Sequence, residues 1–249
     1  MPKSVVDLHE IEPDIVQLTM QDCVSKNTFS EELIHGLAHS FEKINSNPNY
    51  KAVVLTGYAN YFSSGGSQKT LLAMQNGHEI FTDANIYGLA LHCPIPVISA
   101  MQGHAIGGGF VLGLASDFVI LSRESVYTAN FMKYGFTPGM GATYILPKKL
   151  GFSLAEELLL NGGSYRGAEL EKRGVPFPVL FRKDVLEHAY QLARQLSQKP
   201  RLSLTTLKDH LVSPLRKRLH EVIEQEAVMH KKTFQQKEVK DRIIELYGR

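Results

Sequence analysis

The sequence predicts an α/β fold that ends in a helical region. Three observations support this prediction. Short apolar, β-branched stretches alternate with amphipathic ones up to about residue 180, which is typical of strands that alternate with helices. From residue 183 onward, the apolar residues recur at helical spacing. The chain has 249 residues, of which 43% are hydrophobic, and this is enough for one domain with a substantial core.

Alternating apolar and polar residues predict the strands, and apolar residues at helical spacing predict the helices. Thr28-Phe29-Ser30-Glu31 resembles a capping box, and the helix that it starts ends near Asn47-Pro48. Residues 68–82 have no clear pattern. Strands are expected at 4–9, 15–20, 52–56, 117–122 and 125–129, and a further strand starts at Pro96. Further helices are expected at 83–91, 110–115, 153–160, 167–173, 183–198, 200–211, 216–234 and 238–246.

Residues 96–111 have the pattern of a strand, a glycine turn and a helix. Gly103 and the triplet 107–109 precede an apolar run with helical spacing. Unpaired N–H groups at a helix start, next to glycines that allow close approach, favour an oxygen anion. Ala105 stands where a dinucleotide loop needs its second glycine, and no lysine follows as in a P-loop. The remaining candidate ligand for this loop is a small oxyanion, such as a thioester enolate. Tight helix–strand packing is the alternative explanation of these glycines.

Composition argues against several classes of partner. The formal net charge is +2, and no basic stripe with interleaved aromatic residues is present, so no nucleic-acid partner is expected. Cys23 and Cys93 lack metal-ligand spacing and are expected to be reduced thiols. The sequence has neither the apolar segment of a signal peptide nor a run long enough to span a membrane. We therefore expect a cytoplasmic protein without a metal ion or a membrane partner.

Several loops together resemble the crotonase (enoyl-CoA hydratase/isomerase) superfamily. Residues 62–67 look like its Phe-Ala-Ala-Gly-Ala-Asp loop. Residues 96–109 are similar to its Pro-x-Ile-Ala-x-x-x-Gly-x-Ala-x-Gly-Gly-Gly segment, and residues 135–142 to its Gly-x-x-Pro-Gly-x-Gly-Gly loop. The resemblance implies a crotonase-like spiral of ββα repeats in residues 1–190. It also implies that residues 191–249 form a helical region that packs the chain as a homotrimer, or as a hexamer of paired trimers.

The resemblance implies a shared chemistry, in which two backbone N–H groups hold a thioester enolate. By position, these groups belong to Ser64 and Gly108. The substrate is then carried on CoA or on the phosphopantetheine of an acyl carrier protein, and no other cofactor is needed. Hydratases of the family use two carboxylates to activate water, but the corresponding positions here are Val111 and Phe131, which cannot transfer a proton. Hydration by the usual route is therefore not expected.

Residues 102–109, 127–142 and 224–230 look most like the decarboxylating enzymes of polyketide β-branching. That subgroup releases carbon dioxide from a 3-methylglutaconyl thioester on an acyl carrier protein and reprotonates the dienolate. His230 occupies the position of the subgroup's catalytic histidine and is the expected proton donor. An apolar lining would destabilise the substrate carboxylate relative to the charge-delocalised transition state. The residues expected to contact substrate are Phe62, Gly65, Ile80, Val111 and Phe131.

One position departs from the subgroup. Ile80 stands where these enzymes usually have a lysine that is thought to engage the leaving carboxylate, and Lys69 and His78 are nearby substitutes if the segment is shifted. The position of the product double bond, α,β or β,γ, therefore stays open. Two other functions also stay open. One is a CoA-linked isomerase or hydratase, and the other is a catalytically silent homologue that binds a carrier protein.

Overall fold

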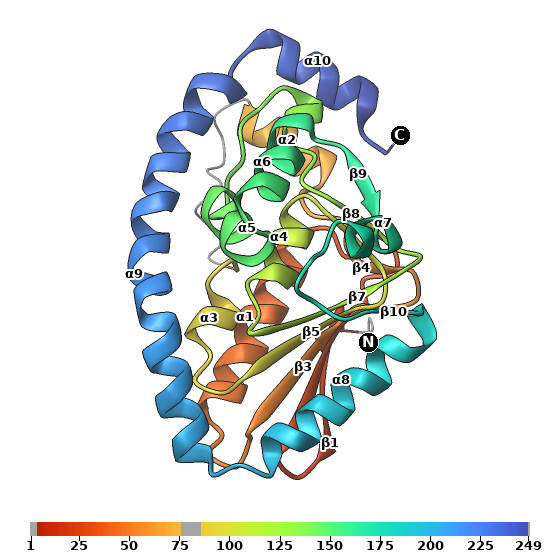
Figure 1. Cartoon of the computed structure of the whole chain (residues 1–249). Helices are drawn as coiled ribbons and strands as arrows, with labels where there is room; N and C mark the ends of the chain where they lie inside the picture. Colours follow the sequence, from red (N-terminus) through yellow and green to blue (C-terminus); the bar gives the residue numbers. More distant parts are fainter. Residues whose placement is uncertain (1–3, 76–85, 249) are drawn as a thin grey trace.

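The computed structural model describes residues 4–75 and 86–248, in which helices surround two β-sheets (Figure 1). The strands are β1 (Val6–Glu12), β2 (Ile15–Met20), β3 (Ala52–Thr56), β4 (Tyr61–Ser63), β5 (Val97–Met101), β6 (His104–Ile106), β7 (Phe118–Ser122), β8 (Val126–Thr128), β9 (Ser164–Arg166) and β10 (Val179–Leu180). The helices are α1 (Glu31–Ser46), α2 (Gln68–Gln75), α3 (Leu89–His92), α4 (Gly108–Leu114), the 3₁₀ helix η1 (Met132–Tyr134), α5 (Ala142–Leu150), α6 (Phe152–Asn161), α7 (Gly167–Lys172), α8 (Arg182–Ser197), α9 (Arg201–Phe234) and α10 (Lys237–Leu246).

The larger sheet has the strand order β1-β2-β3-β5-β7-β10, and the smaller has the order β4-β6-β8-β9. In the larger sheet, β1 and β2 form an antiparallel hairpin, and the other neighbours are parallel. The two sheets alternate along the chain, since β3 and β4, β5 and β6, and β7 and β8 follow one another in pairs. This arrangement agrees with the expected spiral of repeats.

Both faces of the larger sheet are buried. Along β3, Val53 and Leu55 belong to the main core, whereas Ala52 and Val54 belong to a second core together with Val185 of α8. A parallel strand that is covered on both sides reads as a continuous apolar run, and this is why residues 52–56 are recognisable in the sequence.

Helix α1 starts later than its capping signal suggests. Ser30 is the N-cap residue, and its Oγ accepts a hydrogen bond from the Leu33 N–H at 3.2 Å. The expectation of a capping box that starts at Thr28 is therefore wrong. Thr28 instead forms a parallel bridge with Gly65, and the Phe29 N–H donates to the Gly65 carbonyl at 2.8 Å. The residues before α1 are thereby tied to the loop that follows β4.

The C-terminal helices differ from the expected pattern in two ways. Helix α8 covers a face of the larger sheet and spans residue 190, at which the helical region was expected to begin. The two helices expected at 200–211 and 216–234 are one helix of 34 residues, and Pro214 lies inside it. Figure 1 shows α9 along the whole of one side of the molecule, and α10 folding back over α2.

A buried ion pair ties α9 to the core. The Lys208 ammonium, 4% exposed, donates to Asp117 Oδ2 at 2.6 Å and to the carbonyls of Ala90 and Ile95 at 3.0 and 2.8 Å. Asp117 also accepts the Val97 N–H at 2.8 Å, at the start of β5. A buried charge is tolerated only when it is paired and hydrogen-bonded, as here.

Two other helices were not anticipated correctly. Helix α5 follows Gly141, which has a φ of +75°, and it contains Pro147, so its sequence lacks the usual helix signals. The prediction of a helix at 83–91 is wrong for residues 86–88, which form a turn before α3. Residues 83–85 lie outside the described part of the chain.

Candidate active site

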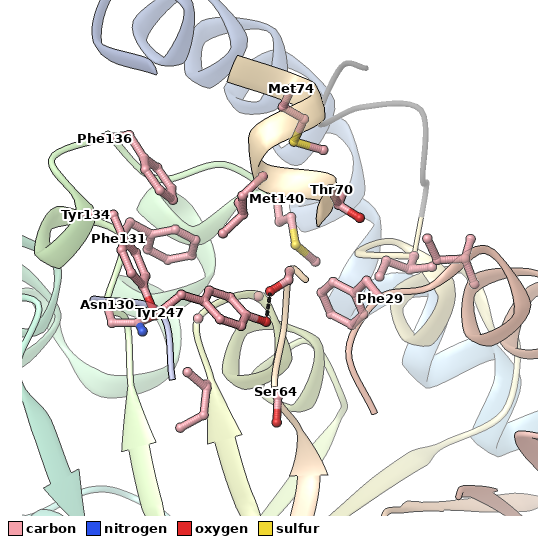
Figure 2. A pocket seen from close by; sticks show the side chains of 17 residues that line it. Phe29, Ser64, Thr70, Met74, Asn130, Phe131, Tyr134, Phe136, Met140 and Tyr247 are labelled. Atoms are coloured by element: carbon pink, nitrogen blue, oxygen red, sulfur yellow. Dashed lines mark hydrogen bonds between the residues drawn. The ribbon is translucent and has the colours of Figure 1, made fainter. Parts of the chain in front are cut away.

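An open cavity lies where the β4–α2 and β6–α4 loops meet. Its wall is largely apolar, and none of the described side chains that line it carries a charge (Figure 2). The lining residues are Phe29, Ile34, Ser64, Gly66, Thr70, Leu71, Met74, Ile86, Ile106, Gly107, Gly108, Asn130, Phe131, Tyr134, Phe136, Met140 and Tyr247. Ser64 and Gly108, which were predicted to hold the oxyanion, are both among them.

The two loops approach at backbone distance because of their glycines. A Cβ on Gly65, where φ is +71°, would lie 2.5 Å from the Ile106 carbonyl oxygen and 3.2 Å from the Gly108 nitrogen. A Cβ on Gly109 would lie 2.4 Å from the Ser63 carbonyl oxygen. Side chains at these positions would push the loops apart. The glycines therefore do serve tight packing, and this packing also brings Ser64 close to Gly108.

The two predicted donor groups have different surroundings. Gly108 is the first residue of α4, where N–H groups have no carbonyl partner within the helix. The Ser64 N–H donates to the Lys26 carbonyl at 3.2 Å. A thioester oxygen at Ser64 would therefore compete with that carbonyl for the proton. Lys26 is held in a left-handed conformation, with a φ of +58°.

The loop that carries Lys26 is anchored by its neighbour. Asn27, fully buried, donates from Nδ2 to the carbonyls of Met20 and Phe62 at 3.0 and 2.9 Å. Its Oδ1 accepts the Asp22 N–H at 2.8 Å. These bonds hold the Lys26 carbonyl in place beside Ser64.

His230 lies on α9, and its tautomer follows from one contact. Its Nδ1 is 2.8 Å from the Thr137 carbonyl oxygen. A carbonyl oxygen only accepts hydrogen bonds, so Nδ1 carries a proton, and in the neutral ring Nε2 carries the lone pair. Burial lowers the pKa of His230 below its usual value, and the bond to Thr137 opposes this in part. The ring packs against Phe136 and Phe234, with centroid distances of 5.5 and 4.4 Å.

His230 lies beside the main cavity rather than in its wall. It lines a small, separate hollow beside the main cavity. The other residues of that lining are Tyr87, Gly139, Met140, Ile223, Glu226 and Ala227. Met140 lines both cavities, so its side chain lies between the space next to Gly108 and the space next to His230.

The predicted substrate contacts have mixed outcomes. Phe131 lines the main cavity. Phe62 and Val111 do not line it, because both are fully buried within the main core. Their side chains lie beneath the wall of this cavity, and their contact with substrate remains a prediction. Phe62 points inward because side chains alternate along β4, and Val111 lies one turn inside α4.

The remaining predicted residues do not line the cavity either. Gly65 lies behind the loop, whose neighbouring residues Ser64 and Gly66 form the wall. Lys69 is exposed on α2 and is not part of the lining. Ile80 and His78 lie outside the described residues.

Sequence reasoning missed two residues near the site. The Tyr247 hydroxyl donates to the Gly66 carbonyl at 3.0 Å, and its ring lines the cavity (Figure 2). Nothing in the sequence around Tyr247 signals this contact, because it depends on α10 folding back. Glu226 is one helical turn before His230, and that i, i+4 spacing is a signal that could have been used.

Glu226 is a buried carboxylate at the start of α5. Its oxygens accept the Gly141 N–H at 2.7 Å, the Thr143 N–H at 2.8 Å and the Thr143 hydroxyl at 2.5 Å. Burial raises the pKa of Glu226, and these hydrogen bonds oppose the rise. The negative charge also complements the helix dipole at this end of α5. Glu226 thereby joins α9 to the loop that contains Met140.

Two classes of site have no support in the described part of the chain. Residues 4–75 and 86–248 contain no group of three or more His, Cys, Asp or Glu side chains that could hold a metal ion. Among the described helices, none combines the length and the apolar character needed to cross a bilayer.

Comparisons with known proteins agree on one family. The family described as enoyl-CoA hydratase/isomerase matches residues 10–247. Bacillaene synthase decarboxylase PksI from Bacillus subtilis (strain 168) is 67% identical over 248 residues, which cover 100% of both chains.

Solved structures give the same picture. A chain from the structure of a dehydratase/decarboxylase enzyme couple involved in polyketide β-branching has a TM-score of 0.98 and 67% identity, and the match covers 99% of this chain and 100% of that one. The ECH2 decarboxylase domain of CurF from Lyngbya majuscula has a TM-score of 0.95 and 47% identity, with coverage of 98% and 100%.

Proposed function

The chain belongs to the enoyl-CoA hydratase/isomerase family, and on this basis we propose that it is a decarboxylase of polyketide β-branching. The observation that supports this most is its 67% identity, along the full length of both chains, to a bacillaene synthase decarboxylase. Val111 and Phe131 stand where the family's hydratases have their carboxylates, so water is not activated in the usual way. The chain releases carbon dioxide from an acyl thioester.

In the proposed reaction the substrate is a 3-methylglutaconyl thioester on the phosphopantetheine of an acyl carrier protein. The bond between the γ carbon and the carboxylate breaks, and carbon dioxide leaves. The electron pair moves through the conjugated chain to the thioester oxygen, which the N–H groups of Ser64 and Gly108 stabilise. Removing one such donor typically costs about 2.7–4 kcal/mol of transition-state stabilisation.

His230 then donates a proton to the dienolate carbon chain. Because Nδ1 is engaged with Thr137, the proton that is transferred comes from Nε2 of the imidazolium form. The ring becomes neutral and takes its next proton from solvent. The lowered pKa of His230 favours this transfer, since it makes the imidazolium a stronger acid.

The wall of the cavity assists the first step. Its described lining residues are uncharged, so a carboxylate that enters loses hydration without gaining an ion-pair partner among them. The transition state spreads the charge toward the thioester oxygen and is destabilised less. Phe131 supplies part of this apolar wall. Ile80 stands at the subgroup's lysine position. We also propose that its uncharged side chain contacts the substrate.

The expected assembly and location belong to the same proposal. The helical region of residues 191–249 packs the subunits as a homotrimer or hexamer, and the exposed Leu202, Leu207 and Leu211 of α9 support this. The partner is an acyl carrier protein, and a dehydratase supplies the unsaturated substrate. The free cysteines Cys23 and Cys93 fit a reducing cytoplasm.

The test compares two reactions of the purified chain. With a 3-methylglutaconyl thioester, release of carbon dioxide in a coupled assay is expected. With crotonyl-CoA, loss of the conjugated thioester absorbance would reveal hydration, and none is expected. Hydration without release of carbon dioxide would overturn the proposal. Binding of the loaded carrier protein without either reaction would favour a catalytically silent homologue.

A further inference from the structure

Met140 separates the two parts of the proposed catalytic machinery. It lines the main cavity together with Ser64 and Gly108, and the smaller cavity together with His230. We propose that the Met140 side chain screens the α carbon of the dienolate from His230, so that the γ carbon is protonated and an α,β-unsaturated thioester is formed. This inference rests on the proposed decarboxylation and adds a residue that determines which product is formed.

The Met140 thioether lies directly on Gly108. A Cβ on Gly108 would lie 2.6 Å from the Met140 sulfur and 2.7 Å from Phe29 Cε2. Met140 is itself only 5% exposed. In Figure 2 the Met140 side chain and the Phe29 ring lie close to one another among the lining residues. The space immediately beside Gly108 is therefore shared by these two side chains.

In the proposed binding mode, the space beside Gly108 holds the α carbon of the substrate. A thioester oxygen held by the Gly108 N–H places the carbonyl carbon next to it, and the α carbon is one bond further. The α carbon therefore falls in the space that Met140 covers. The γ carbon is two bonds beyond the α carbon and extends past the thioether. His230 lines the space on the other side of Met140, so in this proposal the γ carbon is the carbon that lies nearer to its ring.

The backbone holds Met140 in an uncommon conformation. Its φ is +63°, in the left-handed region that residues with side chains seldom adopt. Gly141 follows with a φ of +75°, and its N–H is bound by Glu226 at 2.7 Å. A strained residue held by surrounding hydrogen bonds beside a catalytic group often has a functional role. From this backbone position the Met140 sulfur lies beside Gly108.

The dienolate can be protonated at two carbons, so a single product requires that the enzyme select one of them. Once carbon dioxide has left, the dienolate carries negative charge on the α carbon, the γ carbon and the thioester oxygen. A proton on the γ carbon gives the conjugated α,β product, and a proton on the α carbon gives the β,γ product. Both outcomes use one proton from His230 Nε2 and leave a neutral ring. The position of the acid relative to the two carbons therefore decides the product.

The experiment follows the site of protonation in Met140→Ala, with Met140→Leu as the conservative variant. Met74→Ala is the matched control, because Met74 lines the main cavity but not the cavity of His230. Each enzyme is incubated with a 3-methylglutaconyl thioester in deuterated water, and NMR locates the deuterium and the double bond. The wild type, Met140→Leu and Met74→Ala are expected to place deuterium on the γ carbon. Met140→Ala is expected to raise the ratio of α to γ deuteration at least about tenfold.

The outcomes separate this inference from the proposed function. If Met140→Ala releases carbon dioxide and the ratio is unchanged, the screening role is wrong while decarboxylation stands. A β,γ product from the wild type would also overturn the inference. If the wild type releases no carbon dioxide, the proposed function itself fails. Should Met140→Ala fail to fold, as judged by circular dichroism, Met140→Cys shortens the side chain and is expected to shift the ratio in the same direction.

Discussion

At the scale of single residues, the proposed role of His230 predicts that its protonation state sets the pH dependence of the reaction. Its pKa is below the usual value because the ring is buried, and the Thr137 carbonyl opposes this only in part. The donor is the imidazolium form, so kcat is expected to fall as pH rises through this lowered pKa. His230→Ala is expected to lower kcat by about 10²–10⁴-fold. It is also expected to remove the fall of kcat with rising pH.

The measurement for His230 is kcat against pH for both enzymes, with circular dichroism as the control for folding. A rate that rises with pH through the same range would mean that the neutral ring acts as a base. Full activity of a folded His230→Ala would contradict the assignment of the proton donor.

Gly108 offers a second test at this scale. Gly108→Ala would place a methyl group 2.6 Å from the Met140 sulfur and 2.7 Å from the Phe29 ring, next to the N–H group proposed to hold the oxyanion. Because contacts this short force the backbone or its neighbours to shift, that N–H group loses its position and kcat/KM is expected to fall by about 10²–10³-fold. Gly163→Ala is the control, because its nearest neighbours are atoms of the exposed Asn161 side chain. Equal activity of the two variants would contradict the placement of the oxyanion at Gly108.

The family resemblance predicts Ser64 and Gly108 by position, and both line the cavity, because the glycine loops that carry them are local patterns. It does not tell which way the side chains of Phe62 and Val111 point. That direction depends on how β4 and α4 pack against the core, and both side chains turn inward.

At the scale of elements, the start of α5 depends on a carboxylate from α9. Glu226→Gln replaces one accepting oxygen with an amide nitrogen, which cannot accept the hydrogen bond from Gly141 or Thr143. The loss of a hydrogen bond to a charged group is expected to lower the free energy of unfolding by about 1.5–3 kcal/mol. Denaturant titration measures this change, and Glu224→Gln on the exposed side of the same helix is the control. Similar stabilities of the two variants would show that Glu226 does not hold α5.

Helix α5 also illustrates the limit of local signals. The helix starts after a left-handed glycine and is completed by a side chain from more than eighty positions later in the chain. By contrast, α1 is visible in the sequence, because its apolar stripe and its acidic first turn are local features. The single helix α9 was divided in the prediction because Pro214 is a local breaking signal, whereas its packing is not.

At the scale of the whole molecule, the fold could be predicted because glycine loops recur at recognisable positions along the chain. The approach of α10 to α2 could not, since it brings Tyr247 to Gly66 across 181 positions. The contact between His230 and Thr137 spans 93 positions. These long-range contacts help to form the cavity wall and orient the His230 ring, the proposed proton donor.

The proposed assembly gives a prediction at this scale. Leu207 and Leu211 are exposed on α9, and burial of such side chains between subunits would stabilise a trimer. The double variant Leu207→Glu/Leu211→Glu is expected to shift the molar mass from that of three chains toward that of one, as measured by light scattering after gel filtration. Val24→Glu, in a loop outside the helical region, is the control for added surface charge. A wild type that runs as a monomer would contradict the proposal.

The most direct test of the central claim is the mass of a 3-methylglutaconyl-loaded acyl carrier protein after incubation with the enzyme. The proposed reaction predicts that the intact carrier protein loses the mass of one carbon dioxide, and that His230→Ala leaves most of it unchanged in the same time. A carrier protein that gains the mass of one water would show hydration and contradict the claim. An unchanged mass with the wild-type enzyme would contradict it as well.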